Sequence, residues 1–258
     1  MNRSPRLALP WMALLAACGA PPPTASTAPE PATAAPSATA PSATASVRGV
    51  VRWEGEIPER RVVDLSGTPD CLQTRDAPLL DESIVVHDDR AVESVLLFVD
   101  GSTAAPIATS AVPARLELRG ARFAPHLLAV QAGQRVDFAN ADPLLYNVHL
   151  LPQANDEESF AMPGPGTRSR TFPLPEPGFV KVKDDVHPWM GAWIAVLPHP
   201  WFAVTGDDGR YAIAGVPSGR HTLVLRHPRL GEQRTEIELR DGAAVTHDFT
   251  LRRGPRAE

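Results

Sequence analysis

Short apolar runs separated by turn residues fill the chain from residue 47 to residue 251, and they restrict its fold more than any other feature. Most runs are about four to eight residues long, are rich in Val, Ile, Leu, Phe and Thr, and end at Gly, Pro, Asn or Asp. Examples are residues 93–100, 135–140 and 191–197. No stretch shows a helical period over roughly eleven residues or more. The pattern predicts an all-β fold class built from antiparallel β-sandwiches.

The start of the chain has the composition of a targeting segment. A short basic region precedes the apolar stretch 7–17, which has the length of a signal-peptide core and is too short to span a membrane. The sequence LAACG at residues 15–19 resembles the lipobox of bacterial lipoproteins. The resemblance implies that residues 1–17 are a lipoprotein signal peptide and that Cys18 is the lipidation site. The alternative is an ordinary secretory cleavage nearby, which also gives an exported protein.

From the cysteine to residue 46 the chain consists almost wholly of Ala, Pro, Ser and Thr. Such a segment lacks the apolar side chains that a core needs, so residues 18–46 are expected to be the lipidated cysteine and a disordered tether. Gly19 after the cysteine implies, for the lipoprotein family, routing to the outer membrane. The expected location is therefore the cell envelope, facing the periplasm or the exterior, with the membrane as a partner through the lipid on Cys18.

The net charge and the cysteine content of the chain exclude a nucleic-acid partner and a disulfide framework. The formal net charge is −5 and no basic stripe is visible, so a nucleic-acid partner is excluded. Cys18 and Cys71 are the only cysteines. Lipidation of Cys18 leaves Cys71 without an intramolecular partner, so no disulfide framework is available.

The last part of the chain resembles a carboxypeptidase regulatory-like module. The resemblance rests on FAVTGDDGRYAIAGVPSGRHTLVLRH at residues 202–227, whose Asp-Gly and Pro-Ser-Gly turns separate strand-like runs. It implies a small transthyretin-like β-sandwich without catalysis of its own, assigned to residues 199–258. Residues 47–114 begin with VRGVVRWEGEIP, which also resembles the opening strand of such modules, but this irregular segment is expected to be a β segment packed on the next domain.

Residues 115–198 resemble a cupredoxin, close in pattern to amicyanin-like and plastocyanin-like domains. The resemblance rests on RFAPHLLAVQAGQRVDFAN at residues 122–140, on YNVH at residues 146–149, and on VKVKDDVHPWMGAWIAVL at residues 180–197. It implies a cupredoxin-like Greek-key β-sandwich. A type 1 copper site in this fold has two imidazoles, one thiolate and a weak axial thioether.

Carried over to this chain, the resemblance supplies only half of that ligand set. His187 matches the second imidazole and Met190 the axial thioether. Tyr146 stands where the first imidazole is expected, and Asp184 stands where the thiolate is expected. Cys71 is a conceivable replacement thiolate, but it lies in the irregular N-terminal part. The sequence predicts a copper site that has lost its blue centre.

A weaker metal site stays open as a prediction. Asp184, His187, Met190 and His149 would offer imidazole and carboxylate groups suited to Cu(II) or Zn(II). Strand alternation argues against it, because Tyr146 and His149 are an odd number of residues apart and would face opposite sides of a regular strand. The competing interpretation is that the His187 to Met190 turn only shapes and covers the top of the core.

The preferred hypothesis is an exported, lipid-anchored, non-enzymatic protein that binds or scaffolds an envelope protein or glycan. No hydrolase G-x-S-x-G or metalloprotease H-E-x-x-H motif is present, so no enzyme is expected. No cofactor is expected, with copper as the alternative. The rival functions are a periplasmic copper-binding or electron-transfer protein with altered ligands, and an envelope carbohydrate-binding module that rests on fold analogy alone.

Overall fold

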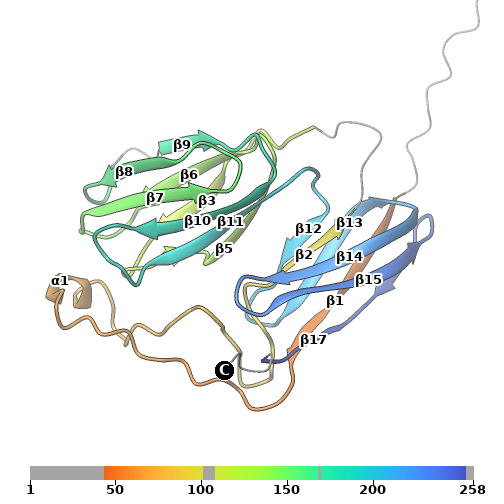
Figure 1. Cartoon of the computed structure of the whole chain (residues 1–258), viewed down its shortest axis with the longest axis horizontal. Coiled ribbons are helices and arrows are strands. Elements are labelled where there is room, and N and C mark those ends of the chain that lie inside the picture. Colours follow the sequence, from red (N-terminus) through yellow and green to blue (C-terminus); the bar gives the residue numbers. More distant parts are fainter. Residues whose placement is uncertain (1–43, 101–107, 168–169, 254–258) are drawn as a thin grey trace, which may run out of the picture. The chain divides into compact units, whose positions relative to one another are not determined.

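The computed structural model describes residues 44–100, 108–167 and 170–253 (Figure 1). Within these ranges there are 17 strands and one helix of four residues, which confirms the all-β fold class. No helix in the described ranges is long and apolar enough to cross a membrane. The expected signal peptide, the lipidation site Cys18 and most of the expected tether lie outside the described residues.

Nine strands between residues 114 and 197 form two sheets, which we call the central sandwich. One sheet has the order β4-β3-β6-β9 and the other the order β5-β11-β10-β7-β8. β3 pairs with β6, and β5 with β11, in parallel, while the other pairs are antiparallel. The strands are β3 (Ala114–Leu118), β4 (Phe123–Ala124), β5 (Leu127–Gln131), β6 (Arg135–Asn140), β7 (Tyr146–Pro152), β8 (Glu158–Met162), β9 (Arg170–Pro173), β10 (Gly178–Asp184) and β11 (Gly191–Leu197).

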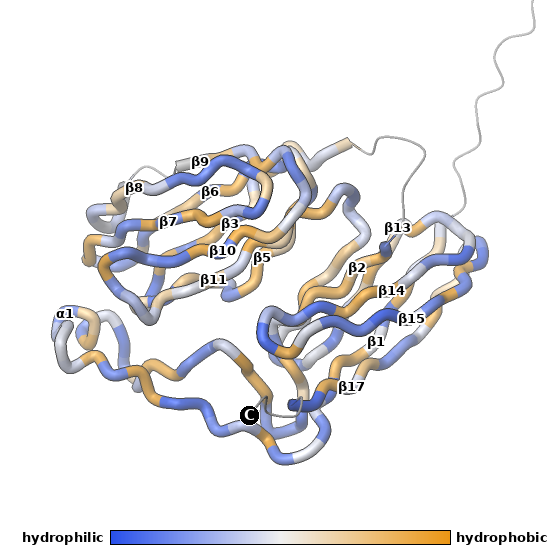
Figure 2. Tube along the Cα trace, viewed as in Figure 1, coloured by the Kyte–Doolittle hydropathy of each residue, from blue (hydrophilic) through white to orange (hydrophobic). Residues whose placement is uncertain are grey.

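Strand alternation builds the core of the central sandwich. In β7, Tyr146, Val148 and Leu150 are buried, while the residues between them are partly exposed. Phe138 of β6 meets Phe160 of β8 edge to face, with 5.3 Å between ring centroids. Each fully buried apolar side chain of this size contributes about 1.5–3 kcal/mol relative to exposure. Figure 2 shows that β11 of this sandwich carries more hydrophobic residues than the largely hydrophilic β15.

Eight further strands, from both ends of the described chain, form what we call the composite sandwich. In one sheet β1 lies between β13 and the successive short strands β16 and β17, and the other sheet has the order β12-β2-β14-β15. The strands are β1 (Thr44–Trp53), β2 (Leu96–Asp100), β12 (Phe202–Val204), β13 (Arg210–Pro217), β14 (Gly219–His227), β15 (Gly231–Leu239), β16 (Ala244–Thr246) and β17 (Phe249–Leu251).

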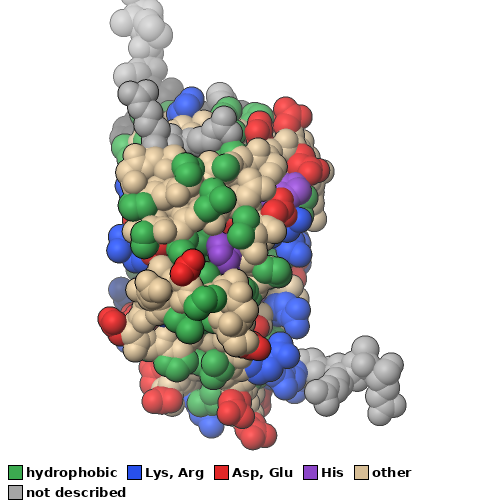
Figure 3. Space-filling model, turned by 90° about the vertical axis from the view of Figure 1, so that its left-hand side faces the viewer, with side chains coloured by type: hydrophobic (Ala, Val, Ile, Leu, Met, Phe, Trp, Pro, Cys, Tyr) green, Lys and Arg blue, Asp and Glu red, His purple; other side chains and the backbone are tan. Residues whose placement is uncertain are grey.

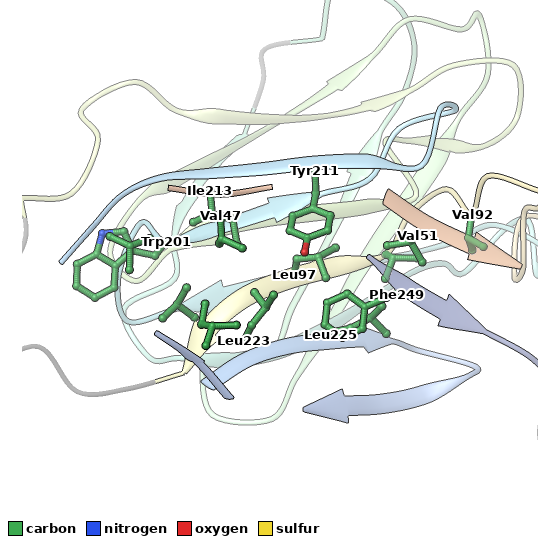
Figure 4. Close-up of a cluster of buried hydrophobic side chains, with 14 of the residues drawn as sticks. Val47, Val51, Val92, Leu97, Trp201, Tyr211, Ile213, Leu223, Leu225 and Phe249 are labelled. Carbon is green, nitrogen blue, oxygen red and sulfur yellow. The ribbon is translucent and has the colours of Figure 1, made fainter. Parts of the chain in front are cut away.

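The composite sandwich corrects the expected role of residues 47–114. β1 pairs with β13, β16 and β17, and β2 pairs with β12 and β14, so neither strand packs as an extra strand on the central sandwich. β1 and β2 belong to this sandwich because their apolar side chains are buried in its core. Val47, Val51 and Leu97 fill the same core as Tyr211 and Phe249 (Figure 4). The central sandwich is therefore inserted between β2 and β12.

β1 also corrects the end of the expected tether. Residues 44–46 were assigned to the tether on composition, but they are the first residues of β1. Thr44 is opposite Pro217 of β13, and Ser46 is opposite Ala244 of β16. Small polar residues are compatible with a strand when both neighbours supply the hydrogen-bonding ladder.

An irregular segment, residues 63–79, lies within the connection from β1 to β2 and contains α1 (Pro69–Leu72). We call it the cap segment. Its residues Leu65, Cys71 and Leu79 form a small apolar cluster with Ala121 of the central sandwich, and Trp189 packs against that cluster. This part of residues 47–114 does pack on the central sandwich.

Candidate functional site

The four positions that the cupredoxin resemblance matches to copper ligands converge at one end of the central sandwich. Tyr146 begins β7, Asp184 ends β10, and His187 and Met190 lie in the turn that leads into β11. All four are buried, with exposed fractions of 6% or less. The Tyr146 and His187 rings meet edge to face with 5.1 Å between centroids, and the Met190 amide donates to the His187 carbonyl at 3.0 Å. We call this group the ligand-loop cluster.

Asp184 is the centre of the ligand-loop cluster. Its Oδ2 accepts a hydrogen bond from the Asn147 amide at 2.6 Å. Its Oδ1 accepts from the amides of Val186 and His187 at 3.1 and 2.7 Å and contacts Nδ1 of the His187 ring at 2.8 Å. A carboxylate has about four lone-pair sites, and four N–H groups approach them here. Asp184 is therefore a buried acceptor held by four donors, three on Oδ1 and one on Oδ2.

Tyr146 is held by a second buried carboxylate. Its hydroxyl donates to Oδ2 of Asp142 at 2.7 Å. Asp142 also accepts from the amides of Gly120 and Ala121 at 2.9 and 3.0 Å. Burial, followed by the hydrogen bond and the charge of Asp142, raises the pKa of Tyr146. The phenol therefore stays protonated and points its proton at Asp142.

These donors do not fit type 1 copper. That centre needs a thiolate and two imidazole nitrogens with free lone pairs. Here the phenol of Tyr146 is protonated, the carboxylate of Asp184 accepts from four N–H groups, and Nδ1 of His187 is directed at Asp184. Within the described ranges no three His, Cys, Asp or Glu side chains are grouped so that they could hold a metal ion.

His149 is not part of the ligand-loop cluster. It lies in β7 on the face opposite to Tyr146, as alternation requires. Its Nδ1 contacts Asp185 at 3.0 Å and its Nε2 contacts Glu157 at 2.6 Å. Lys183 forms an ion pair with the same Asp185 at 2.7 Å. The structure thus places His149 in an outward-facing charge cluster, separate from Asp184, His187 and Met190.

Cys71 lies closer to the ligand-loop cluster than its position in the sequence indicated. It is buried in the cap segment against Ala121, the residue whose carbonyl accepts from the Trp189 indole at 3.1 Å. Burial is the main cause that raises the pKa of the Cys71 thiol, and the carboxylates Asp142 and Asp184 raise it further. A protonated, buried thiol is neither a reactive nucleophile nor a metal ligand.

A second candidate site, a pocket with His126 and His227 in its wall, has no counterpart in the sequence analysis. No ligand-like spacing links these two histidines in the sequence. They come from different sandwiches and meet only in the folded chain. The sequence contains no local signal that could have paired them.

The described residues define an all-β protein made of two sandwiches. The model of the carboxypeptidase regulatory-like domain family matches residues 178–252, which confirms the expected module. The match begins in β10 of the central sandwich, upstream of the expected start at residue 199. No curated protein matches the chain in sequence.

The solved structures similar to the chain include several cupredoxins. Amicyanin from Paracoccus versutus is 18% identical over 39% of this chain and 96% of its own, with a TM-score of 0.30. A purple cupredoxin from Nitrosopumilus maritimus is 19% identical over 32% and 98%, with a TM-score of 0.27. A copper-containing nitrite reductase from Thermus scotoductus SA-01 is 24% identical over 36% of this chain, with a TM-score of 0.29. The chain spans only 25% of that reductase.

Proposed function

We propose that this chain is an exported, lipid-anchored, non-enzymatic protein that binds or scaffolds a partner in the cell envelope. Its central sandwich has a hydrogen-bonded ligand-loop cluster in place of a type 1 copper centre. The observation that carries the proposal is the position of Asp184, whose two oxygens face four N–H groups at 2.6–3.1 Å where a thiolate would be needed.

The side chains around the ligand-loop cluster also favour a role without catalysis. The pair of Asp184 and His187 is buried, and neither ring nor carboxylate has a hydroxyl or thiol nucleophile as a hydrogen-bond partner among the described contacts. The more exposed pair of His149 and Asp185 has Nε2 of the imidazole occupied by Glu157. A nucleophile and its base need a direct hydrogen bond, and neither histidine offers one.

Copper titration of the full chain tests the proposal. We expect no tightly held copper and no intense visible absorption after Cu(II) is added and the excess is removed. One tightly held copper per chain with the intense colour of a copper–thiolate bond would contradict it. Tight colourless binding would favour the rival function, a copper-binding protein with an altered ligand set.

A double variant tests whether the ligand positions are correctly assigned. Tyr146→His together with Asp184→Cys supplies the two missing ligands at positions that already lie beside His187 and Met190. We expect this variant to bind copper and turn blue. A colourless variant that stays folded would show that the cupredoxin correspondence of these positions is wrong.

The proposed anchor has a separate test. Cys18→Ser removes the thiol that would carry the lipid. We expect the variant to move from the membrane fraction to the soluble fraction of cells, while the unsubstituted chain stays with the membrane. Equal distribution of both proteins would remove the lipid anchor from the proposal and leave the copper result untouched.

A further inference from the structure

The pocket noted above has a volume of about 380 Å³, which lies within the range of roughly 300–1,000 Å³ typical of small-molecule sites. Three stretches of the chain line it: residues 79–83 next to the cap segment, residues 189–193 at the start of β11, and residues 227–229 after β14. The wall is completed by single residues from other parts of the chain: Val63, Ser94, Arg122, His126, Lys181 and Val182. Residues far apart in the sequence therefore converge on one cavity.

His126 lines this pocket, and one of its ring nitrogens is buried without a hydrogen-bond partner. Its Nδ1 is the one buried side-chain nitrogen or oxygen without a hydrogen-bond partner in the described part of the chain. Burial is the main cause that lowers the pKa of His126, so the ring is neutral near pH 7. The ring also contacts the backbone of Gly191, and this contact favours the proton on Nε2. Nδ1 then has a free lone pair and can accept a hydrogen bond.

His227 supplies a hydrogen-bond donor, which complements the acceptor on His126. Its Nδ1 accepts a hydrogen bond from the Arg229 amide at 3.1 Å, so the ring proton sits on Nε2. The residue is 4% exposed, and burial, followed by His126 and Arg229, lowers the pKa of His227 to about 4. Since each imidazole is neutral near pH 7, the pocket offers one ring acceptor and one ring donor that do not depend on charge.

The charges of the pocket wall nearly cancel. The cations are Arg122, Lys181 and Arg229, and the carboxylates are Asp81 and Glu82, which leaves a formal charge of +1. Glu82 is paired with Arg122 at 2.9 Å. A wall of this kind has many directed donors and acceptors but lacks the excess of cations that a phosphate group requires.

Two tryptophans, Trp189 and Trp193, add broad apolar surface to the same wall. The indole of Trp189 is fixed by its hydrogen bond to the Ala121 carbonyl at 3.1 Å. Large, rigid aromatic side chains contribute contact area at low conformational cost. A ligand with both apolar ring edges and several hydroxyl groups would use the aromatic and the polar parts of the wall together.

We infer that this pocket binds a sugar of one or two rings, as the terminal unit of an envelope glycan. A sugar hydroxyl both donates and accepts, so one hydroxyl can accept from Nε2 of His227. Another can donate to Nδ1 of His126 after a turn of that ring brings the buried nitrogen to the pocket. Two imidazoles without a third ligand do not complete a metal site, which separates this ligand class from copper. The inference rests on the binding role proposed above and names the ligand class for it.

Titration of the full chain with maltose, cellobiose and chitobiose tests the inference. Binding is followed by saturation-transfer difference NMR and by calorimetry at millimolar sugar concentrations. We expect at least one disaccharide to bind, with His126→Leu and His227→Leu each weakening the affinity about tenfold or more. His221→Leu is the matched control, because His221 lies in β14 with its Nε2 on the Pro217 carbonyl and does not line the pocket.

Two results would overturn the inference. One is the failure of all three disaccharides to bind a chain that circular dichroism shows to be folded. The other is binding that His126→Leu, His227→Leu and His221→Leu weaken equally. Neither result affects the copper titration. A failure of the sugar-binding inference can therefore be distinguished from a failure of the proposed function. Circular dichroism of each variant shows whether a loss of affinity comes from unfolding.

Discussion

Two histidines of the central sandwich, His187 and His126, lie in opposite situations. His187 occupies the position that the cupredoxin pattern marks as a ligand, and its Nδ1 is directed at Asp184 at 2.8 Å. His126 belongs to no ligand pattern, and its Nδ1 is buried without a partner. The comparison separates two ways to locate a candidate site, by a motif that resembles a family and by unmet hydrogen-bonding capacity, which a ligand could satisfy. The two places differ in this chain.

The largest expected effect is the loss of stability in Asp184→Ala. The substitution leaves three backbone N–H groups and the His187 ring without their acceptor in a buried position. We expect the free energy of unfolding to fall by about 3–5 kcal/mol, measured by urea denaturation. Asp185→Ala is the matched control one residue along the chain, where the carboxylate is partly exposed, and should cost less than about 1 kcal/mol. Equal losses would mean that the ligand-loop cluster is not closed as described.

The next largest effect is the dependence of the free energy of unfolding on pH, which comes from His227. Its pKa is lowered to about 4, whereas an unfolded histidine titrates near 6.5. Above about pH 6.5 both states are neutral and the stability is intact. Below it the unfolded state binds the proton first, so stability is lost as the pH falls toward 4, by about 3 kcal/mol at most.

The measurement is urea denaturation at a series of pH values between about 7 and 4, compared with His227→Leu. The variant should lose this part of the dependence and show a flatter profile. A profile unchanged by the substitution would place the acid sensitivity elsewhere, for example at His126, whose pKa is also lowered by burial.

A smaller effect separates the two buried tyrosine hydroxyls. Tyr146 donates to the carboxylate of Asp142 at 2.7 Å, whereas Tyr211 donates to the neutral carbonyl of His247 at 2.5 Å. Hydrogen bonds to charged groups contribute about 1.5–3 kcal/mol and neutral ones about 0.5–1.5 kcal/mol. Tyr146→Phe should therefore lower the melting temperature more than Tyr211→Phe. The reverse order would mean that the hydrogen bond to Asp142 is not the stronger of the two.

The smallest effect is expected for His126→Leu without ligand. Replacing an imidazole whose Nδ1 is unpaired removes an unfavourable buried group, which offsets the lost contact with Gly191. The free energy of unfolding should change by less than about 1 kcal/mol in urea denaturation. A loss of more than about 2 kcal/mol would show that Nδ1 is already satisfied by an ordered water.

Much of the ligand-loop cluster could be predicted from the sequence. The cupredoxin pattern placed Tyr146, Asp184, His187 and Met190 together, and the structure brings these four side chains to one end of the sandwich. The parity of strand positions also predicted that His149 would face away from Tyr146. The first inference rests on the family resemblance. Only the second uses local periodicity, which a strand preserves whatever its partners are.

The composite sandwich and the pocket could not be predicted in the same way. The pairing of Val47 with Ile213 and with Val245 joins residues from opposite ends of the chain. Short β runs have similar apolar patterns, so composition alone does not say which run is the neighbour of which. The pocket depends further on the meeting of His126 and His227, which requires both sandwiches to be in place.

The position of β1 has a mechanical consequence. This strand is bordered by β13 on one side and by β16 and β17 on the other, and the chain toward Cys18 leaves from its first residue, Thr44. Tension applied through the N-terminal chain would be carried by the hydrogen bonds of β1 along its length, in shear. The inserted central sandwich lies outside that load path, so pulling at the N-terminus would strain the composite sandwich first.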